Sequence, residues 1–239
     1  MVDILGGIVK ALQLILSGDP TLYGILYRSL FFSGIAVILA TLWGTPIAMI
    51  LGLRDFRGKT IVKTFFSSLI GIPTVVLGLV LFLFFSKGGL LGSLGLLYTP
   101  AAIILGEAVL VTPILISIAT SAIEAVDPEI MNLSKTLGAS ESQASIAVLK
   151  EALNGVLLSN IASFNRAIAE LGVALLVGGN IAGLTDVLTT AISRYTARGE
   201  LDLAIALGIL LMAIVFGINM IVIAGRKAKF LLTLGRSPQ

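Results

Sequence analysis

The chain has 239 residues, of which 57% are hydrophobic and only 12% charged, with a mean hydropathy of +1.07. Soluble domains average about 45–50% apolar and about 25% charged residues, so this composition indicates a chain that lies mostly in hydrocarbon. The absence of cysteine and histidine excludes disulfides, thiolate nucleophiles, zinc sites and histidine-based proton transfer, and the basic residues fall in short clusters between apolar runs, a placement typical of membrane loops rather than of a nucleic-acid-binding surface.

The N-terminal segment, residues 1–19, is predicted to lie on the membrane. Residues 2–17 are too short between Asp3 and Asp19 to span hydrocarbon comfortably, and Lys10 interrupts them. Four apolar residues recur at helical spacing: Ile4, Ile8, Leu12 and Ile15. This spacing favours an interfacial amphipathic helix, with a sixth span as the weaker alternative.

Five later segments have the length and composition of membrane spans. A span needs roughly 20 apolar residues to cross the hydrocarbon core of a bilayer. The five segments are Ser29–Leu53, Thr64–Ser86, Pro100–Ile123, Ala152–Gly178 and Leu203–Ala224. Pro46, Pro73 and Pro113 lie inside three of them and predict kinks. We therefore expect an all-α integral membrane protein in a single permease-like domain covering residues 1–239.

The basic residues divide unequally between the two sides of these spans. One side holds ten: Arg54, Arg57, Lys59, Lys63, Lys135, Lys150, Arg226, Lys227, Lys229 and Arg236. The other side holds five: Lys10, Arg28, Lys87, Arg194 and Arg198. The richer side is predicted to be cytoplasmic. In a cell membrane the N-terminus is then outside, while the 124–151 loop and the 225–239 tail are cytoplasmic.

The loop at 124–151 is predicted to form two short helices that meet at a corner. Asp127-Pro128-Glu129 combines a helix N-cap, a proline at the first helical position and an acidic residue near the positive end of the dipole. Gly138 is suited to the positive φ that ends such a helix. Ser140 and Gln143 have the spacing of a capping box and open a second helix.

This loop resembles the EAA loop of ABC importer permeases, in which a glycine follows a short helix that docks into the ATPase subunit. The glycine spacing matches, with Asn132-Leu133-Ser134 in place of Glu-Ala-Ala, Val148 in place of isoleucine and Lys150-Glu151 in place of Leu-Pro. The resemblance implies ATPase coupling through six residues: Lys135, Thr136, Leu137, Gly138, Ala139 and Ser140.

The fourth span extends the resemblance to the molybdate, tungstate and sulfate permeases. Residues 163–172 read SFNRAIAELG and residues 178–181 read GGNI, similar to the helix that follows the EAA loop in that family. Residues 20–225 follow the order of the family's core, and the whole is most similar to the tungstate-type permeases. The resemblance implies that this helix lines the passage, and it assigns pathway lining to Ser163, Arg166 and Glu170.

Two charges in that span need compensation. An arginine near the middle of a span costs about 2.5–3.5 kcal/mol on insertion scales. Arg166 and Glu170 lie one helical turn apart, so each can compensate the other. Two interpretations stay open: a buried structural pair, with Glu107 as a further possible member, or an Arg166 that faces an anion passage. Asn165 and Ser163 add hydrogen-bond donors on the same helix.

Two further segments, residues 185–198 and residues 52–60, carry local sequence patterns. Thr185 is predicted to cap a short helix over 186–197 on the outer surface, where Arg194 and Arg198 are interpreted as solvated charges. Residues 52–60 (GLRDFRGKT) approach a phosphate-binding loop, but five residues separate the glycines instead of four and a membrane helix precedes them. The chain therefore needs a partner to hydrolyse ATP.

Together these features predict the permease subunit of an ABC importer for a small oxyanion such as tungstate or molybdate. The resemblance implies a homodimer with two cytoplasmic ATPases, which bind the ATP and Mg, and with an extracytoplasmic substrate-binding protein. No catalytic, metal or cofactor site is expected in the chain. The alternatives are a permease for sulfate, phosphate or an amino acid, and a stand-alone channel or secondary transporter.

Overall fold

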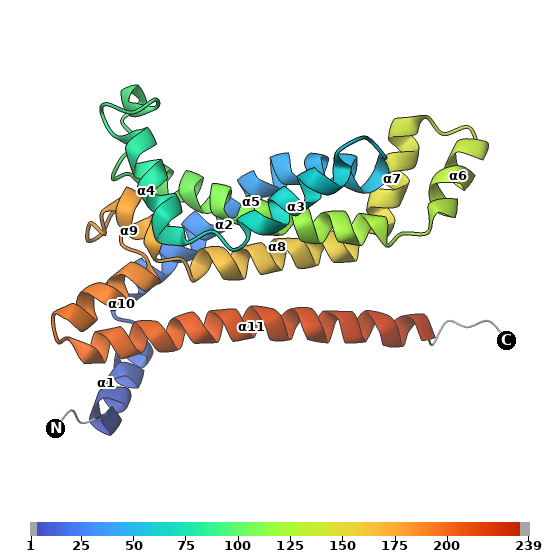
Figure 1. Ribbon diagram of the computed structural model, residues 1–239. Helices are drawn as coiled ribbons and strands as arrows, with labels where there is room; N and C mark the ends of the chain where they lie inside the picture. Colours follow the sequence, from blue (N-terminus) through green and yellow to red (C-terminus); the bar gives the residue numbers. More distant parts are fainter. Residues whose placement is uncertain (1–3, 235–239) are drawn as a thin grey trace.

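The computed structural model describes the backbone of residues 4–234 and the side chains of residues 7–221, and within that part all regular structure is helical (Figure 1). The helices are α1 Ile4–Ser17, α2 Pro20–Leu53, α3 Lys59–Leu69, α4 Thr74–Phe85, the 3-10 helix η1 Gly92–Leu94, α5 Pro100–Glu124, α6 Pro128–Thr136, α7 Glu141–Glu151, α8 Leu153–Ile168, α9 Gly172–Gly178, α10 Leu188–Ala197 and α11 Leu201–Leu234. The predicted all-α membrane fold is confirmed. The last residues of the predicted tail, 235–239, lie outside the described part.

The bundle has two distinct ends (Figure 1). Helices α6 and α7 stand at one end, which we call the α6 end. Helices α1 and α10 stand at the other, which we call the α1 end. Helices α2, α5, α8 and α11 run between the two ends, while α4 projects from the bundle near the α1 end.

Only three of the five predicted spans are single helices. Helices α2, α5 and the described part of α11 (Leu201–Ile221) are each long and apolar enough to cross a membrane. The predicted span Thr64–Ser86 is instead broken into α3 and α4, which meet at 98°. The predicted span Ala152–Gly178 is also discontinuous, because α8 ends at Ile168 and α9 begins at Gly172. Helix α7 meets α8 at 65°. Among the described residues, three helices can cross a membrane, and the number of spans rises to five if each bent pair counts as one.

The prolines alone do not explain the difference between a continuous and a broken helix. Pro46 and Pro113 lie inside the continuous helices α2 and α5. Gly71-Ile72-Pro73 lies between α3 and α4, where the helical hydrogen bonds are interrupted. Gly44-Thr45-Pro46 in α2 has the same spacing of glycine and proline, yet that helix continues through it. The break between α3 and α4 is therefore not decided by this local pattern alone.

Helix α2 begins nine residues earlier than the predicted start at Ser29. Asp19 caps it, because its carboxylate accepts the N–H of Leu22 at 2.9 Å, and Pro20 occupies the first turn. The extra turns bring Leu22 and Ile25 into a buried cluster with α1, α10 and α11. Helix α1, at 14 residues, is shorter than the roughly 20 residues of a span.

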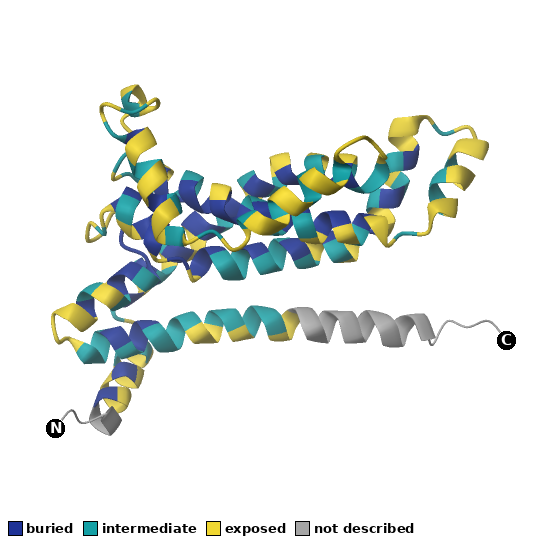
Figure 2. Ribbon diagram, in the orientation of Figure 1, coloured by how far each residue is buried: buried dark blue, intermediate teal, exposed yellow. Residues whose placement is uncertain are grey.

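Helix α5 is the centre of the bundle. More than half of its most apolar window (56%) is buried, against 33% for α2 and 17% for α11. It packs against α2, α8, α9 and α3, and Figure 2 shows buried residues concentrated along α2 and α5. The large apolar surface left exposed on the outer helices is what a membrane protein presents to lipid or to a partner subunit.

Candidate functional site

Helices α6 and α7 form a helix–corner–helix unit at the α6 end, as the sequence predicted. Asp127 caps α6 by accepting the Glu129 N–H at 2.9 Å. Ser140 and Gln143 form a reciprocal capping box: the Gln143 N–H donates to Ser140 Oγ at 3.3 Å, and the Ser140 N–H donates to Gln143 Oε1 at 2.8 Å. These local bonds fix where each helix starts and leave the corner between them to Gly138.

Gly138 adopts a φ of +89° at this corner. A Cβ built on it would meet no atom within 4 Å, so the glycine is needed for its backbone conformation and not for space. Among its neighbours, Lys135, Thr136, Leu137 and Ser140 are exposed and Ala139 is half-buried. Leu133 and Leu137, one turn apart, are 61% and 80% exposed, which leaves an apolar face uncovered at this corner.

The unit is fastened to the bundle through α7. Val148 is buried in a cluster with Ala48 of α2 and Ile123 of α5, and Ala144 of the same helix is also buried. Within the described residues, α6 contributes only half-buried side chains to that cluster. The α6–α7 unit therefore contacts α2, α5 and α8 through one shared cluster, to which α7 contributes the buried residue Val148.

The two charges of the fourth span form an ion pair. Arg166 Nη1 lies 2.6 Å from Glu170 Oε2, with the Arg166 side chain 33% exposed and that of Glu170 only 2% exposed. The other carboxylate oxygen of Glu170 accepts the Val173 N–H at 3.0 Å, and its backbone carbonyl accepts the Thr189 hydroxyl. Glu170 thus caps α9 across the break that follows α8, and both of its carboxylate oxygens are used inside the chain.

The remaining predicted residues of this helix are not brought together around the pair. Glu107 of α5 is buried and makes no ion pair with Arg166; it contacts Ser33 of α2, and its carboxylate lies near enough to that of Glu170 for the two to interact electrostatically. One of its carboxylate oxygens has no hydrogen-bond partner. Ser163 is also buried without a partner for its hydroxyl. Asn165 donates to Asn219 Oδ1 of α11 at 3.2 Å. Within the described residues the ion pair thus consists of Arg166 and Glu170 alone, and a place for Glu107 beside the passage stays a prediction.

A buried charge cluster at the α1 end escaped the sequence analysis. Asp186, 2% exposed, binds Arg28 of α2 at 2.6 Å and Arg194 of α10 at 2.9 Å. Burial by itself would lower the pKa of Arg194, but the hydrogen bond and charge of Asp186 outweigh it and raise that pKa. Arg194 is thus not a solvated charge, while Arg198 is exposed as expected.

The cap predicted for α10 is also wrong. Thr185 is buried, and its hydroxyl donates to the Gly178 carbonyl and accepts the Ile181 N–H, so it ties the turn after α9 instead. Helix α10 begins at Leu188, where Thr190 accepts the Val187 N–H at 3.0 Å. No local signal predicts the Arg28–Asp186 contact, because 158 residues separate the two in sequence.

A second charge cluster lies at the α6 end, where α3 meets the end of α5. Glu124 binds Lys63 at 2.6 Å and Lys59 at 3.2 Å, and Lys59 also binds Asp55 at 3.2 Å. Burial would raise the pKa of Glu124, but the hydrogen bonds and charges of the two lysines outweigh it and lower that pKa. The carboxylate is therefore held ionised beside the base of the α6–α7 unit.

The comparisons with known proteins agree with this geometry. The model of the family described as "Binding-protein-dependent transport system inner membrane component" matches residues 44–228. The chain is 37% identical over 216 residues to the tungstate uptake system permease protein TupB of Peptoclostridium acidaminophilum, covering 90% of this chain and 95% of that protein. It is 39% identical over 196 residues to a probable anion ABC transporter permease protein of Haloferax volcanii, covering 80% of this chain and 84% of the relative.

Solved structures show the same fold at low sequence identity. A chain of the MetNI methionine ABC transporter in an inward-facing conformation superposes with a TM-score of 0.70 at 16% identity, covering 88% of this chain and 98% of that one. A chain of an amino acid ABC transporter superposes with a TM-score of 0.67 at 17% identity, covering 95% and 99%.

Proposed function

The chain belongs to the family of binding-protein-dependent transport system inner membrane components, and from this premise we propose that it is the permease subunit of an ATP-driven importer of tungstate or a similar tetrahedral oxyanion. The relatives named for tungstate uptake cover nearly the whole chain, which supports this substrate over sulfate, phosphate or an amino acid. Tungstate offers no apolar surface, so its passage needs hydrogen-bond donors and a positive field.

The single observation that carries the transport mechanism is the α6–Gly138–α7 unit. Its α6 presents exposed Leu133 and Leu137, and its α7 is packed into the bundle. We place an ATPase subunit against α6, one for each copy of the chain in a homodimer. The ATPases bind ATP and Mg, and movement of α6 is transmitted through α7 to α5 and α8. The passage between the two copies then opens alternately to either side.

The orientation follows from the same assignment. An ATPase is cytoplasmic, so the α6 end faces the cytoplasm and the α1 end faces outward, toward the binding protein that delivers the anion. This agrees with the excess of Lys and Arg in the loops of the α6 end. The chain itself does not hydrolyse ATP; it supplies the passage and the α6–α7 unit that transmits the movement.

The test replaces Gly138 in the complex of permease, ATPase and binding protein. A valine forced to positive φ costs roughly 1–2 kcal/mol, and open space around the Cβ means that no clash adds to this. We expect Gly138→Val to insert normally, to lower uptake of radiolabelled tungstate about tenfold or more, and to lose stimulation of ATP hydrolysis by the loaded binding protein. Gly138→Asn, which tolerates positive φ, should stay close to the wild type.

A matched control is available at the opposite end. Gly199 has a φ of +76° and equally open surroundings, but lies between α10 and α11. Gly199→Val should therefore leave coupling intact. Unchanged uptake in Gly138→Val would refute the role of the corner. A wild-type complex that moves sulfate or methionine but neither tungstate nor molybdate would refute the substrate.

A further inference from the structure

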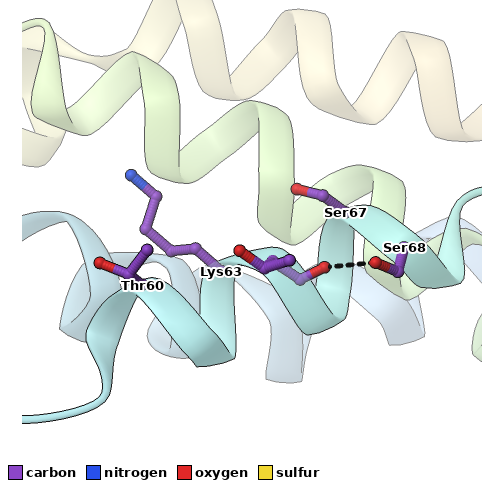
Figure 3. Close-up of a pocket in the computed structure, with 5 residues that line it drawn as sticks. Thr60, Lys63, Ser67 and Ser68 are labelled. Atoms are coloured by element: carbon purple, nitrogen blue, oxygen red, sulfur yellow. Dashed lines mark hydrogen bonds between the residues drawn. The ribbon is translucent and has the colours of Figure 1, made fainter.

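Helix α3 carries a polar face that the predicted passage on the fourth span does not include. Four hydroxyl side chains share this face with Lys63: Thr60, Thr64, Ser67 and Ser68. At 100° per residue the five fall within an arc of about 140°. They line an open hollow of about 450 Å³, and Figure 3 shows the hydroxyls and Lys63 along one side of the helix.

The polar face of α3 is poorly suited to contact with lipid. The neighbouring face of α3 presents Ile61 and Phe65, which are 75% and 58% exposed and suit hydrocarbon. A lysine and a row of hydroxyls facing hydrocarbon would be costly, since only Ser68 of the four has a hydrogen bond to the helix backbone, to Thr64 O at 2.8 Å. The polar face of α3 therefore borders a polar space.

The hollow continues inward between α3 and α5. A second hollow of about 80 Å³ shares Lys63 and Ser67 with the first, and its α5 wall carries three more hydroxyls: Ser117, Thr120 and Ser121. The hydroxyl oxygens of Ser117 and Thr120 are buried and have no hydrogen-bond partner, and Thr120 is only 1% exposed. Buried polar groups are nearly always satisfied, so these two donors indicate a polar guest.

Lys63 joins the two hollows and is the cation nearest to these hydroxyls. Its ammonium group is held by Glu124 at 2.6 Å, and Glu124 also holds Lys59. The Glu124 carboxylate sits where α5 ends, beside the α6–α7 unit, and both hollows are otherwise lined by hydroxyl and apolar side chains. Neutral donors bind an oxyanion weakly enough to release it, and the ammonium group of Lys63 supplies the attraction.

We propose that this groove, lined by the seven hydroxyls of α3 and α5, is the exit passage for the oxyanion, and that Lys63 exchanges Glu124 for the anion as it leaves. The inference rests on the proposed function, and it moves the exit from the fourth span to the α3–α5 groove. Because Glu124 directly precedes the α6–α7 unit, movement of that unit shifts the carboxylate and frees or recaptures Lys63.

The absence of cysteine from the sequence makes the groove directly testable. Single variants Thr64→Cys and Ser67→Cys, in the complete transporter in liposomes, are treated with an anionic methanethiosulfonate reagent. We expect rapid labelling, loss of uptake on labelling, and protection of at least fivefold in rate by millimolar tungstate or molybdate during turnover. Thr21→Cys, an exposed threonine at the α1 end, should show neither protection nor inhibition.

Side-chain substitutions give a second readout. Lys63→Gln should lower the maximal uptake rate about tenfold, while the binding protein still stimulates ATP hydrolysis. Lys63→Arg keeps the positive charge and should retain most of the wild-type uptake rate. Thr64→Val and Thr120→Val should each lower uptake about threefold, whereas the isosteric control Thr21→Val should not.

The outcomes separate the two proposals. If the wild type moves no oxyanion, the proposed function fails. If the wild type transports but both cysteines label without tungstate protection and Lys63→Gln transports normally, the exit passage is overturned. Labelling that anionic lipid blocks and tungstate does not would assign the groove to lipid headgroup phosphate, which also overturns it.

Discussion

Replacing Asp186 with asparagine removes the one buried charge that two half-buried arginines share. The carboxylate binds Arg28 at 2.6 Å and Arg194 at 2.9 Å, and it also accepts the Gly183 N–H at 3.0 Å. The two arginine side chains are 19% and 12% exposed. Asparagine keeps the shape and one acceptor but leaves both guanidinium groups without a counter-charge. The cluster connects α2 to the segment between α9 and α10, so its loss should weaken the packing of these elements at the α1 end.

The expected loss of stability follows from what each arginine retains. Removing one partner of a buried ion pair costs about 3–5 kcal/mol. Arg28 Nε still donates to the Asp186 carbonyl at 3.1 Å, and Arg194 Nη1 still donates to the Asn180 carbonyl at 3.2 Å. Both also keep some contact with solvent. We therefore expect a loss near the lower limit, about 3 kcal/mol, which for a chain of this size is roughly 6–12 °C in Tm.

The assay is thermal unfolding of the purified permease in one detergent, with Asp202→Asn as the matched control. Asp202 pairs with Lys10 at 3.1 Å, but these side chains are 39% and 68% exposed. Exposed pairs contribute about 0–1 kcal/mol, so this variant should lower Tm by at most a few degrees. Equal shifts in the two variants, or a change below about 1 kcal/mol for Asp186→Asn, would refute the reasoning from burial.

Two further predictions concern packing and pH. Gly172 of α9 lies against α4, where an added Cβ would sit 2.9 Å from the Val75 backbone nitrogen. Gly172→Ala should therefore lower the free energy of unfolding by about 1–3 kcal/mol. Gly34→Ala, in open space on α2, is the control and should not lower Tm. Glu124 has a folded-state pKa below its ordinary value of 4.5, so its contribution to stability is present above pH 4.5 and is lost as the pH falls through the lower folded value. Glu124→Gln should therefore lower Tm above pH 4.5 and flatten the acid limb of its pH dependence; parallel curves for variant and wild type would contradict this.

Local sequence signals were sufficient wherever the structure depends on neighbours in the chain. The N-cap at Asp127, the capping box at Ser140 and the corner at Gly138 were all predictable, because each depends on a few consecutive residues and on backbone geometry. The apolar runs that form α2, α5 and α11 were predictable for a similar reason, since spanning hydrocarbon requires length and composition alone. The Asp19-Pro20 signal at the start of α2 was equally available in the sequence and was missed.

Contacts between distant segments were decided only by the tertiary structure. The sequence placed Arg166 and Glu170 one turn apart, but only the fold shows Glu170 capping α9 and Glu107 left out of the pair. It could not bring Arg28 to Asp186, because apolar periodicity specifies which residues are buried but not which charges meet when helices pack. The hydroxyl face of α3 was likewise not predicted, because three of its four hydroxyl residues fall in the predicted span Thr64–Ser86. Only the tertiary structure shows that the chain breaks before Pro73 and that α3 packs against α5. Composition and local spacing determined that this chain crosses a membrane and carries a bent α6–α7 unit; the packing of its helices decided where its charges and polar surfaces lie.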